Sequence, residues 1–447
     1  MPEVSEVAHV CALLRRQTLG FRVVGASVPV DSLLWPSIKA ASNAEDEAER
    51  IKTQLVGSSV ISTGRHGKYF WLRLKPKDVD RTNVLLMHFG MTGMIKIRNV
   101  KSHLIFMENG GDKKLVEQEK MAANLQEEVA EPDTSWPPRF TKFELELLKD
   151  GVKLEVAFVD ARRLGRARLV QDDKAQTDEG LLKLPPLNAL GPDYSKAQHV
   201  AKTTKTPSSE AAAFEFGDPD PDHHGRPRLG VEAFSKLVLS RKKAIKTLLL
   251  DQALFAGVGN WVGDEVIFHA KLHPEEVISS KISHEEGDSI HPVIQNLYNS
   301  LIYVCEESVK VEGAVRKFPK HWLMRHRWGK ARKRQGPSKT EEGHVLDHIT
   351  VGGRTSCFAP EVQKFLKVGK PKPVAVKTET ETTSKRKRLL SSHDDEDSKS
   401  QPCKPKKPTS SKRQKVDQAS VSNGKDGEHK TVKTRTSARI KAMSRQQ

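Results

Sequence analysis

The hydrophobic periodicity of this 447-residue chain changes near Val231, and that change limits the folds open to it. Before this point come short apolar runs separated by turn residues, at 21–28, 58–66, 68–74, 83–97, 143–160 and 167–170. Such runs predict β-strands arranged as a sandwich or barrel. After Val231 the apolar spacing is helical, with a break at the two glycines of ALFAGVGN (253–260). The sequence therefore predicts an α+β protein, with a β domain followed by a helical domain.

The first residues allow two interpretations. Apolar side chains recur at helical spacing over 4–14, which predicts a packed helix that begins directly after Pro2. Proline is well tolerated in the first turn of a helix, so this is the structural interpretation. The chemical one is that removal of Met1 leaves Pro2 as a free secondary amine, and α-amino groups titrate near ~8, well below the ~10.4 of lysine. Such an amine is nucleophilic at neutral pH, and its attack on a sugar C1′ would give an iminium.

Glu3 and Glu6 lie one helical turn apart, on one face of this expected helix. The helix dipole favours their negative charge, which would lower their pKa values. Repulsion between the two carboxylates acts in the opposite direction and would raise one pKa. The sequence leaves the sign open, and two glutamates in a first turn are also ordinary helix chemistry.

Composition divides the chain into five parts. We expect an N-terminal β-sandwich domain over 1–195 with an insertion at about 104–138, and a flexible linker over 196–228. A helical domain over 229–325 and a turn-rich β element over 326–366 follow. Residues 367–447 are poor in apolar residues and are expected to form a disordered basic tail.

Charge is concentrated in that tail. It holds 22 lysines and arginines against 9 aspartates and glutamates, so it carries +13 of the net charge of +18. KRKR (385–388) and the basic run over 404–415 are typical of nuclear-localisation signals, although a merely solubilising tail is the alternative. Four scattered cysteines fit reduced thiols inside a cell, and we expect neither a signal peptide nor a membrane-spanning segment.

Several separated motifs resemble, in the same order, those of the formamidopyrimidine-DNA glycosylase and endonuclease VIII family. They are PEVSEV (2–7), the HGK turn (66–68), HFGMTGM (88–94), VDARRLG (159–165) and AGVGN (256–260). The resemblance covers most of residues 1–366, apart from the segments at 104–138 and 196–228. It implies a catalytic β-sandwich domain, a helix-two-turn-helix DNA-binding domain and a β-hairpin finger.

The resemblance also assigns roles to individual residues. It implies that Pro2 is the nucleophile, that Glu3 is a general acid and base with Glu6 beside it, and that Lys68 contacts the phosphate next to the lesion. His88 would meet the DNA backbone, Met91 would fill the space of an expelled nucleotide, and Arg162 would face the orphaned base. Leu164 stands where many relatives have phenylalanine. The remaining implied phosphate contacts are Lys246, Gly259, Asn260 and, from the finger, Arg354.

The expected finger lacks the usual zinc ligands. ITVGGRTSCFAPEVQ (349–363) resembles the finger hairpin, but Cys357 is the only cysteine there, and His344 and His348 have no cysteine partners at ligand spacing. This pattern resembles the zincless finger of the plant and fungal branch. We therefore expect no metal and no redox cofactor.

These observations favour a nuclear, bifunctional DNA glycosylase and AP lyase that acts as a monomer on duplex DNA with an oxidised base or an abasic site. The chain leaves little room for a base-covering loop between 318–330 and the finger. This favours formamidopyrimidines and further-oxidised guanines over 8-oxoguanine as substrates. An import receptor is the expected partner of the tail, and no membrane is expected. Two alternatives stay open: a non-catalytic reader of damaged DNA on the same fold, and a basic scaffold protein that acts through its tail.

Overall fold

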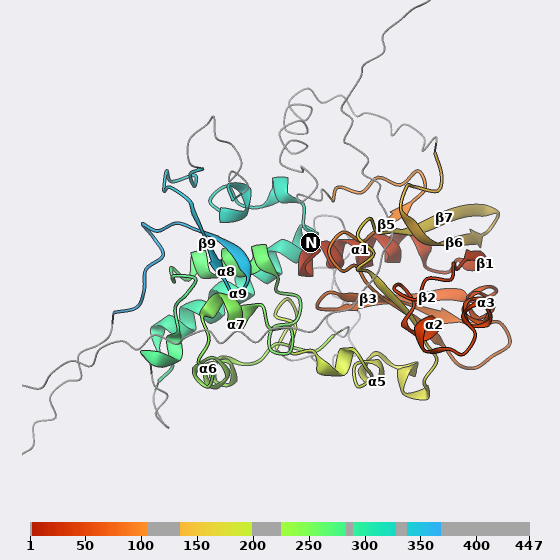
Figure 1. Ribbon diagram of the computed structural model, residues 1–447, viewed down its shortest axis with the longest axis horizontal. Helices are drawn as coiled ribbons and strands as arrows, with labels where there is room; N and C mark the ends of the chain where they lie inside the picture. Colours follow the sequence, from red (N-terminus) through yellow and green to blue (C-terminus); the bar gives the residue numbers. More distant parts are fainter. Residues whose placement is uncertain (1, 105–134, 199–224, 283–288, 328–337, 368–447) are drawn as a thin grey trace, which may run out of the picture. The chain divides into compact units, whose positions relative to one another are not determined.

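The computed structural model describes residues 2–104, 135–198, 225–282, 289–327 and 338–367 (Figure 1). These residues all belong to one unit, Met1–Lys372. The helices are α1 (Val4–Thr18), α2 (Pro36–Ala40), α3 (Ala44–Leu55), α5 (Asp178–Leu181), α6 (Val231–Leu239), α7 (Ile245–Leu249), α8 (Asn260–His269) and α9 (Pro292–Lys310). The strands are β1 (Arg22–Ser27), β2 (Ser59–His66), β3 (Tyr69–Lys75), β4 (Asn83–His88), β5 (Met94–Ile97), β6 (Thr141–Lys149), β7 (Val152–Val159), β8 (Arg166–Val170), β9 (Asp347–Val351) and β10 (Arg354–Phe358).

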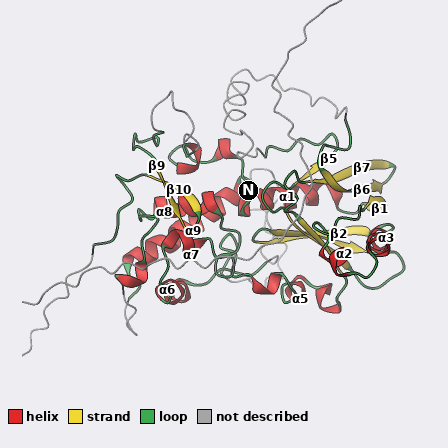
Figure 2. Cartoon of the chain, in the orientation of Figure 1, coloured by secondary structure: helices red, strands yellow, loops and turns green. Residues whose placement is uncertain are grey.

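Strands β1–β8 form one antiparallel sheet in the order β5-β7-β6-β1-β2-β3-β4-β8. Figure 2 shows the strands in yellow. Strands β1 and β2 are joined by a single register pair, Arg22 with Ser59, whereas β6 and β7 pair along their whole length. Because this seam is so short, the sheet divides there into two halves. Inner side chains of both halves, among them Phe70 and Phe143, share one apolar core. The β-sandwich expected from the strand pattern is confirmed.

Helix α1 links the sandwich to the helical half of the molecule. Val4 and Ala8 pack into the core of the helical half, and Val7, Cys11 and Leu14 pack into the sandwich core. The helix is therefore buried on more sides than the single apolar face that we expected, because it lies between β2 and α9. Figure 1 shows its N-terminus where strands and helices meet.

Helices α2 and α3 were not expected from the sequence. Pro36 occupies the first turn of α2, and the Asn43 side chain caps α3 by accepting hydrogen bonds from the N–H groups of Glu45 and Asp46. Buried Ile51 and Leu55 then attach α3 to the sandwich core. These are standard start signals for helices, so the local sequence contained this information.

The helical half differs from the expectation at one break. The periodic stretch over 230–252 forms two helices, α6 and α7, because the exposed cations of 241–243 give the chain no apolar anchor between them. Helix α8 begins at Asn260, directly after the two glycines, as the pattern predicted. Strands β9 and β10 form the expected hairpin, with Val351 paired to Arg354 across a two-glycine turn.

The domain boundaries need one correction. Lys196 is fully buried, and the Arg226 guanidinium donates to the Leu182 carbonyl oxygen (2.8 Å). Both ends of the expected linker over 196–228 therefore belong to the fold, while residues 199–224 lie outside the described residues. Most of the expected insertion (105–134) and the tail from 368 also lie outside them. Among the described helices, none has the length and apolar composition to cross a membrane.

Candidate active site

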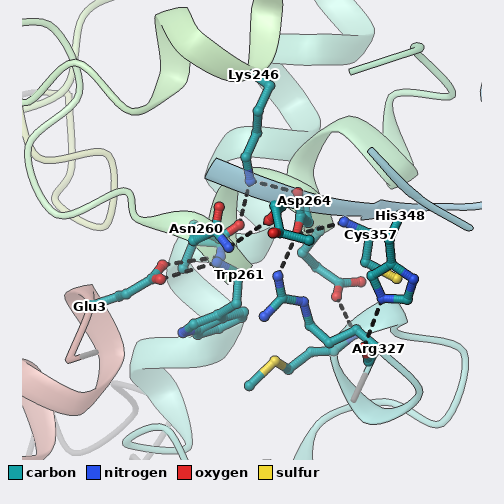
Figure 3. A network of polar contacts seen from close by, with 12 residues as sticks. Glu3, Lys246, Asn260, Trp261, Asp264, Arg327, His348 and Cys357 are labelled. Atoms are coloured by element: carbon teal, nitrogen blue, oxygen red, sulfur yellow. Dashed lines mark hydrogen bonds and ion pairs between the residues drawn. The ribbon is translucent and has the colours of Figure 1, made fainter. Parts of the chain in front are cut away.

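The start of α1 is attached to the start of α8 through Glu3 (Figure 3). The Glu3 carboxylate accepts hydrogen bonds from the backbone N–H groups of Trp261 (3.0 Å) and Val262 (3.1 Å). These N–H groups have no partner within the helix, and the helix dipole favours a negative charge at this end. Glu3 is 1 % exposed, so it is held firmly beside its neighbour Pro2, which is also buried.

The two glycines before α8 make room for the chain's N-terminal residues. A Cβ on Gly259 would lie 2.1 Å from the Glu3 Cδ, and one on Gly257 would lie 2.9 Å from the Val4 Cβ. The Val4 N–H also donates to the Gly257 carbonyl (3.1 Å). We expected Gly259 to open the α8 N-terminus to a DNA phosphate. Glu3 occupies the N–H groups of Trp261 and Val262, whereas a phosphate contact at Gly259 itself stays a prediction.

Glu6 lies directly beside Glu3. The Glu3 N–H donates to Glu6 Oε2 (3.0 Å), and the Trp261 indole N–H donates to Glu6 Oε1 (3.1 Å). Burial, together with the nearby negative charge of Glu3, raises the pKa of Glu6. The sequence left open whether the pKa of Glu6 is raised or lowered. It is raised, because burial and repulsion outweigh the hydrogen bonds that would lower it.

Lys68 lies in the tight turn between β2 and β3, as predicted, and is half-buried. Burial lowers the pKa of Lys68, while the charge of Glu3 raises it and that of Arg354 lowers it. These interacting charges come from the chain's N-terminus and from the β9–β10 hairpin. The β2–β3 turn, the start of α1 and the finger therefore meet in one place.

A buried ion pair holds the Lys68 turn. The Arg65 guanidinium donates to Asp193 Oδ2 (2.8 Å), which also accepts from the Gly67 N–H (3.0 Å), and neither charged side chain is exposed. Burial acts to raise the pKa of Asp193, but the charges of Arg65 and Lys196 outweigh it, so the pKa is lowered. Because Asp193 bonds the turn itself, it fixes the backbone from which Lys68 projects.

His66, on the same hairpin, makes stability depend on pH. Its Nδ1 accepts from the Arg226 N–H (3.2 Å), and burial lowers the pKa of His66 to about 4. An unfolded histidine titrates near ~6.5, so between about pH 6.5 and 4 the unfolded chain binds a proton that the folded chain does not. The free energy of unfolding therefore decreases as the pH is lowered through this range. We expect His66→Gln to reduce this slope by at most about 1.4 kcal/mol per pH unit. Urea unfolding across this range measures it, and equal slopes would contradict the assignment.

A pocket of about 380 Å³ lies beside this cluster. Lys68, His88, Asn260 and Arg354 all line it, although they come from the hairpin turn, β4, α8 and the finger. The His88 Nδ1 accepts from the Gly90 N–H (3.1 Å), and burial, with the charge of Lys68, lowers the pKa of His88 to about 4. The imidazole is therefore uncharged at neutral pH, which leaves Nε2 as its N–H donor.

Met91, Arg162 and Leu164 lie on two loops that are bonded together. The buried Asp160 carboxylate accepts from the Thr92 hydroxyl (2.6 Å) and from the N–H groups of Arg162 (3.1 Å) and Leu164 (2.7 Å). Arg162 and Leu164 are exposed, and an Arg162 guanidinium nitrogen lies 3.7 Å from the Met91 sulfur. The three side chains expected to enter a duplex are thus neighbours on one accessible edge.

Lys246 differs from the expectation. Its side chain is fully buried, and its ammonium donates to Asp264 Oδ1 (2.5 Å) and to the Asn260 carbonyl. An ammonium enclosed in this way does not reach a DNA phosphate, so the prediction of a direct contact was wrong. Asn260 and Arg354 do border the pocket, and the Asn260 side chain donates to the Thr355 carbonyl (2.9 Å).

The finger's histidines and cysteine have other partners. His344 Nδ1 lies 2.7 Å from Glu361, His348 Nε2 lies 3.3 Å from the Arg327 carbonyl, and Cys357 is buried against apolar side chains. Burial raises the pKa of the Cys357 thiol to about 12. Within the part of the chain that the structure describes, no three His, Cys, Asp or Glu residues are grouped closely enough to hold a metal ion.

Comparison with known proteins identifies this arrangement. Residues 1–167 match the model of the formamidopyrimidine-DNA glycosylase N-terminal domain, and residues 218–313 match that of the formamidopyrimidine-DNA glycosylase H2TH domain. The chain belongs to the formamidopyrimidine-DNA glycosylase family. It is therefore an enzyme, a DNA glycosylase, and the resemblance inferred from the motifs is confirmed.

Relatives from plants and bacteria align over most of the chain. The formamidopyrimidine-DNA glycosylase of Arabidopsis thaliana is 28 % identical over 364 residues, which cover 81 % of this chain and 71 % of the relative. That of Heliobacterium modesticaldum is 26 % identical over 368 residues, 81 % of this chain and all of the relative.

Solved structures of the family share the fold. A complex of Lactococcus lactis Fpg with abasic-site DNA matches with a TM-score of 0.51 at 18 % identity, and covers 81 % of this chain and 99 % of that one. A MutM complex with DNA containing carbocyclic 8-oxo-G matches equally well, at 19 % identity and with full coverage of that chain. The expected α+β architecture is thus confirmed.

Sequence reasoning missed three buried carboxylates of this family member: Asp160, Asp193 and Asp264. Each holds a loop, turn or hairpin that carries an expected DNA contact. Asp160 lies inside the VDARRLG motif, so its position there was the available signal. Asp193 and Asp264 lie far along the chain from Arg65 and Arg327, the arginines that they pair with, and no local pattern marks these pairs.

Proposed function

We propose that this enzyme removes oxidised purines, namely formamidopyrimidines and oxidised guanines, from duplex DNA and then cuts the strand at the abasic site. The meeting of Glu3, Lys68 and Arg354 beside one pocket carries this proposal. A base can react only after its nucleotide leaves the stack, and such a nucleotide brings two phosphates with it. The carboxylate of Glu3 suits proton transfer at the sugar of this nucleotide, and the two cations, Lys68 and Arg354, suit its two phosphates.

DNA with a lesion is the proposed partner. The solved proteins that share the fold are named as complexes with DNA that holds an abasic site or 8-oxo-G, which supports it. In this chain Lys68, Asn260 and Arg354 would grip phosphates. Met91, Arg162 and Leu164 would fill the space that the flipped nucleotide leaves, which offsets part of the few kcal/mol that flipping costs.

The chemistry proceeds by covalent catalysis from Pro2. Its secondary amine attacks C1′, the bond from C1′ to the base breaks, and Glu3 supplies the proton that leaves with the base. The amine then loses its proton, and the C1′–O4′ bond breaks as O4′ takes up a proton, which opens the sugar ring and gives an iminium. The iminium acidifies the C2′ proton, and loss of that proton breaks the C3′–O bond in β-elimination. A second elimination breaks the C5′–O bond, and water then hydrolyses the bond between C1′ and the Pro2 nitrogen, which releases the sugar remnant and restores the amine. None of these steps consumes an oxidant or a metal.

We expect full-length protein with a verified N-terminal proline to nick a labelled duplex at a single abasic site. It should also release formamidopyrimidines and further-oxidised guanines from a lesion panel, with 8-oxoguanine as a weaker substrate. Gel analysis of the cut strand and chromatography of released bases measure both. Tight binding of the damaged duplex without any nick would instead identify a non-catalytic reader on this fold.

We also propose a monomeric enzyme located in the nucleus, with the basic runs at 385–388 and 404–415 as the signals for an import receptor. A chain that ends at Lys367 separates this role from catalysis. It should keep the nicking activity and lose nuclear accumulation in cells. If deletion of the tail removed nicking as well, the protein would be a basic scaffold rather than the proposed enzyme.

A further inference from the structure

Asp264 is the centre of a buried charge cluster in the helical half (Figure 3). Its Oδ1 accepts from the Lys246 ammonium, and its Oδ2 accepts from the Arg327 guanidinium and from the Cys357 N–H (3.2 Å). Asp264 and Lys246 have no exposed side-chain surface, and Arg327 has 7 %. One carboxylate therefore binds α7, the segment after α9 and strand β10 of the finger.

Two backbone groups attach β10 to α8. Cys357 donates its N–H to Asp264, and the Thr355 carbonyl accepts from the Asn260 side chain (2.9 Å). These residues are two apart in a strand, so their backbone groups point to the same edge. The turn of the hairpin is also close, because a Cβ on Gly352 would lie 2.6 Å from the Thr247 Oγ1. These contacts fix both where the finger lies and which residues of β10 face α8.

Arg354 is the residue immediately before these attachments. It is exposed and borders the pocket, and it follows the glycine turn at the first position of β10. We propose that Asp264 is a positioning residue of the reaction, which holds the finger so that Arg354 grips a phosphate of the flipped nucleotide. This inference rests on the proposed function, since it assumes that damaged DNA occupies the pocket.

The cluster can hold the finger because the buried cations Lys246 and Arg327 both need the negative charge of Asp264 as their partner. Burial lowers the pKa of Lys246, whereas the neighbouring Asp264 raises it. Removal of the carboxylate would leave two cations buried without their counter-charge, which is strongly unfavourable. The finger would then move, because Arg327 and Cys357 would lose the acceptor that they share. Asp264 thus acts on DNA through the finger that it holds in place.

The test is a double-mutant cycle between Asp264→Asn and Arg354→Ala, read as affinity for a duplex with a tetrahydrofuran abasic-site analogue. We expect each single variant to weaken binding about tenfold, or about 1.4 kcal/mol. The double variant should bind no more weakly than Arg354→Ala alone, since coupled residues are not additive. The slope of log affinity against log salt should become shallower by about 0.9 in both single variants.

Asp178→Asn is the matched control. Asp178 also pairs a largely buried carboxylate with an arginine, Arg73, but it lies on α5, in the sandwich half. Its effect should be additive with Arg354→Ala, with an unchanged salt slope. Should Asp264→Asn melt below the assay temperature, Arg327→Gln takes its place in the cycle and should show the same lack of additivity.

Additive losses for Asp264 and Arg354 would overturn this inference. The proposed function is judged separately, because the same wild-type preparation is assayed for nicking of an abasic duplex. Wild-type protein that binds but never nicks would contradict the proposed function. Wild-type nicking combined with an additive cycle would reject only the role of Asp264.

Discussion

Blocking the secondary amine of Pro2 is expected to abolish borohydride trapping of the enzyme on damaged duplex DNA. Borohydride reduces the iminium between the amine and C1′ to a stable bond, so trapped complex reports that intermediate directly. In a chain that keeps a residue before Pro2, the proline nitrogen is part of a tertiary amide. Its lone pair is delocalised into the carbonyl, so it does not attack a sugar. We expect trapping and nicking to fall about a thousandfold or more.

The comparison needs two preparations that differ only at the N-terminus. One carries an N-terminal tag that remains in place, and the other carries the same tag at the C-terminus and a proline verified by mass spectrometry. Pro2→Gly is a second variant, which should trap less complex, because its primary amine gives a neutral imine that must be protonated before it matches the charged iminium of proline. Wild-type trapping by the blocked chain would assign the covalent step to another amine, and Lys68 would be the next candidate to test.

Local patterns in the sequence were sufficient for the parts of the site built from single segments. The HGK turn placed Lys68 in a hairpin, and AGVGN placed Asn260 at the start of a helix, because turns and helix starts depend on nearby residues. The helical face of 4–14 placed Glu3 and Glu6 beside Pro2 for the same reason. That these segments meet at one pocket came only from the family resemblance.

Contacts between distant segments were beyond the sequence. The sequence around Lys246 predicts an accessible cation, whereas in the structure Lys246 is buried and paired with Asp264. No sequence pattern near either residue predicts that pair. The same holds for Arg65 and Asp193. The pKa shift of Glu6 is a further case. Its direction depends on burial of Glu6 by the helical half of the molecule, and an isolated helix would not be buried in this way.

Gly259→Ala is expected to disable the enzyme through steric conflict with Glu3. Gly259 has φ −124°, which alanine adopts without strain, so the backbone is not the obstacle. The added Cβ would lie 2.1 Å from Glu3 Cδ and 2.5 Å from its Oε1, a separation that two such atoms do not tolerate. The carboxylate must therefore leave the N–H groups of Trp261 and Val262. We expect a loss of about 3 kcal/mol in unfolding free energy, and about a hundredfold in base excision.

A second background separates this mechanism from a general defect. In Glu3→Ala the atoms that Gly259→Ala would strike are gone, so the same substitution should cost little further stability there. Gly25→Ala in β1 is the matched control, since the atoms nearest to its Cβ would be those of the exposed Glu146 side chain, at 3.3 Å or more, and excision should be unchanged. Chemical denaturation and single-turnover excision measure both quantities. An equal loss of stability from Gly259→Ala in both backgrounds would mean that Gly259 is needed for α8 itself, and that the attachment of Glu3 is not what it protects.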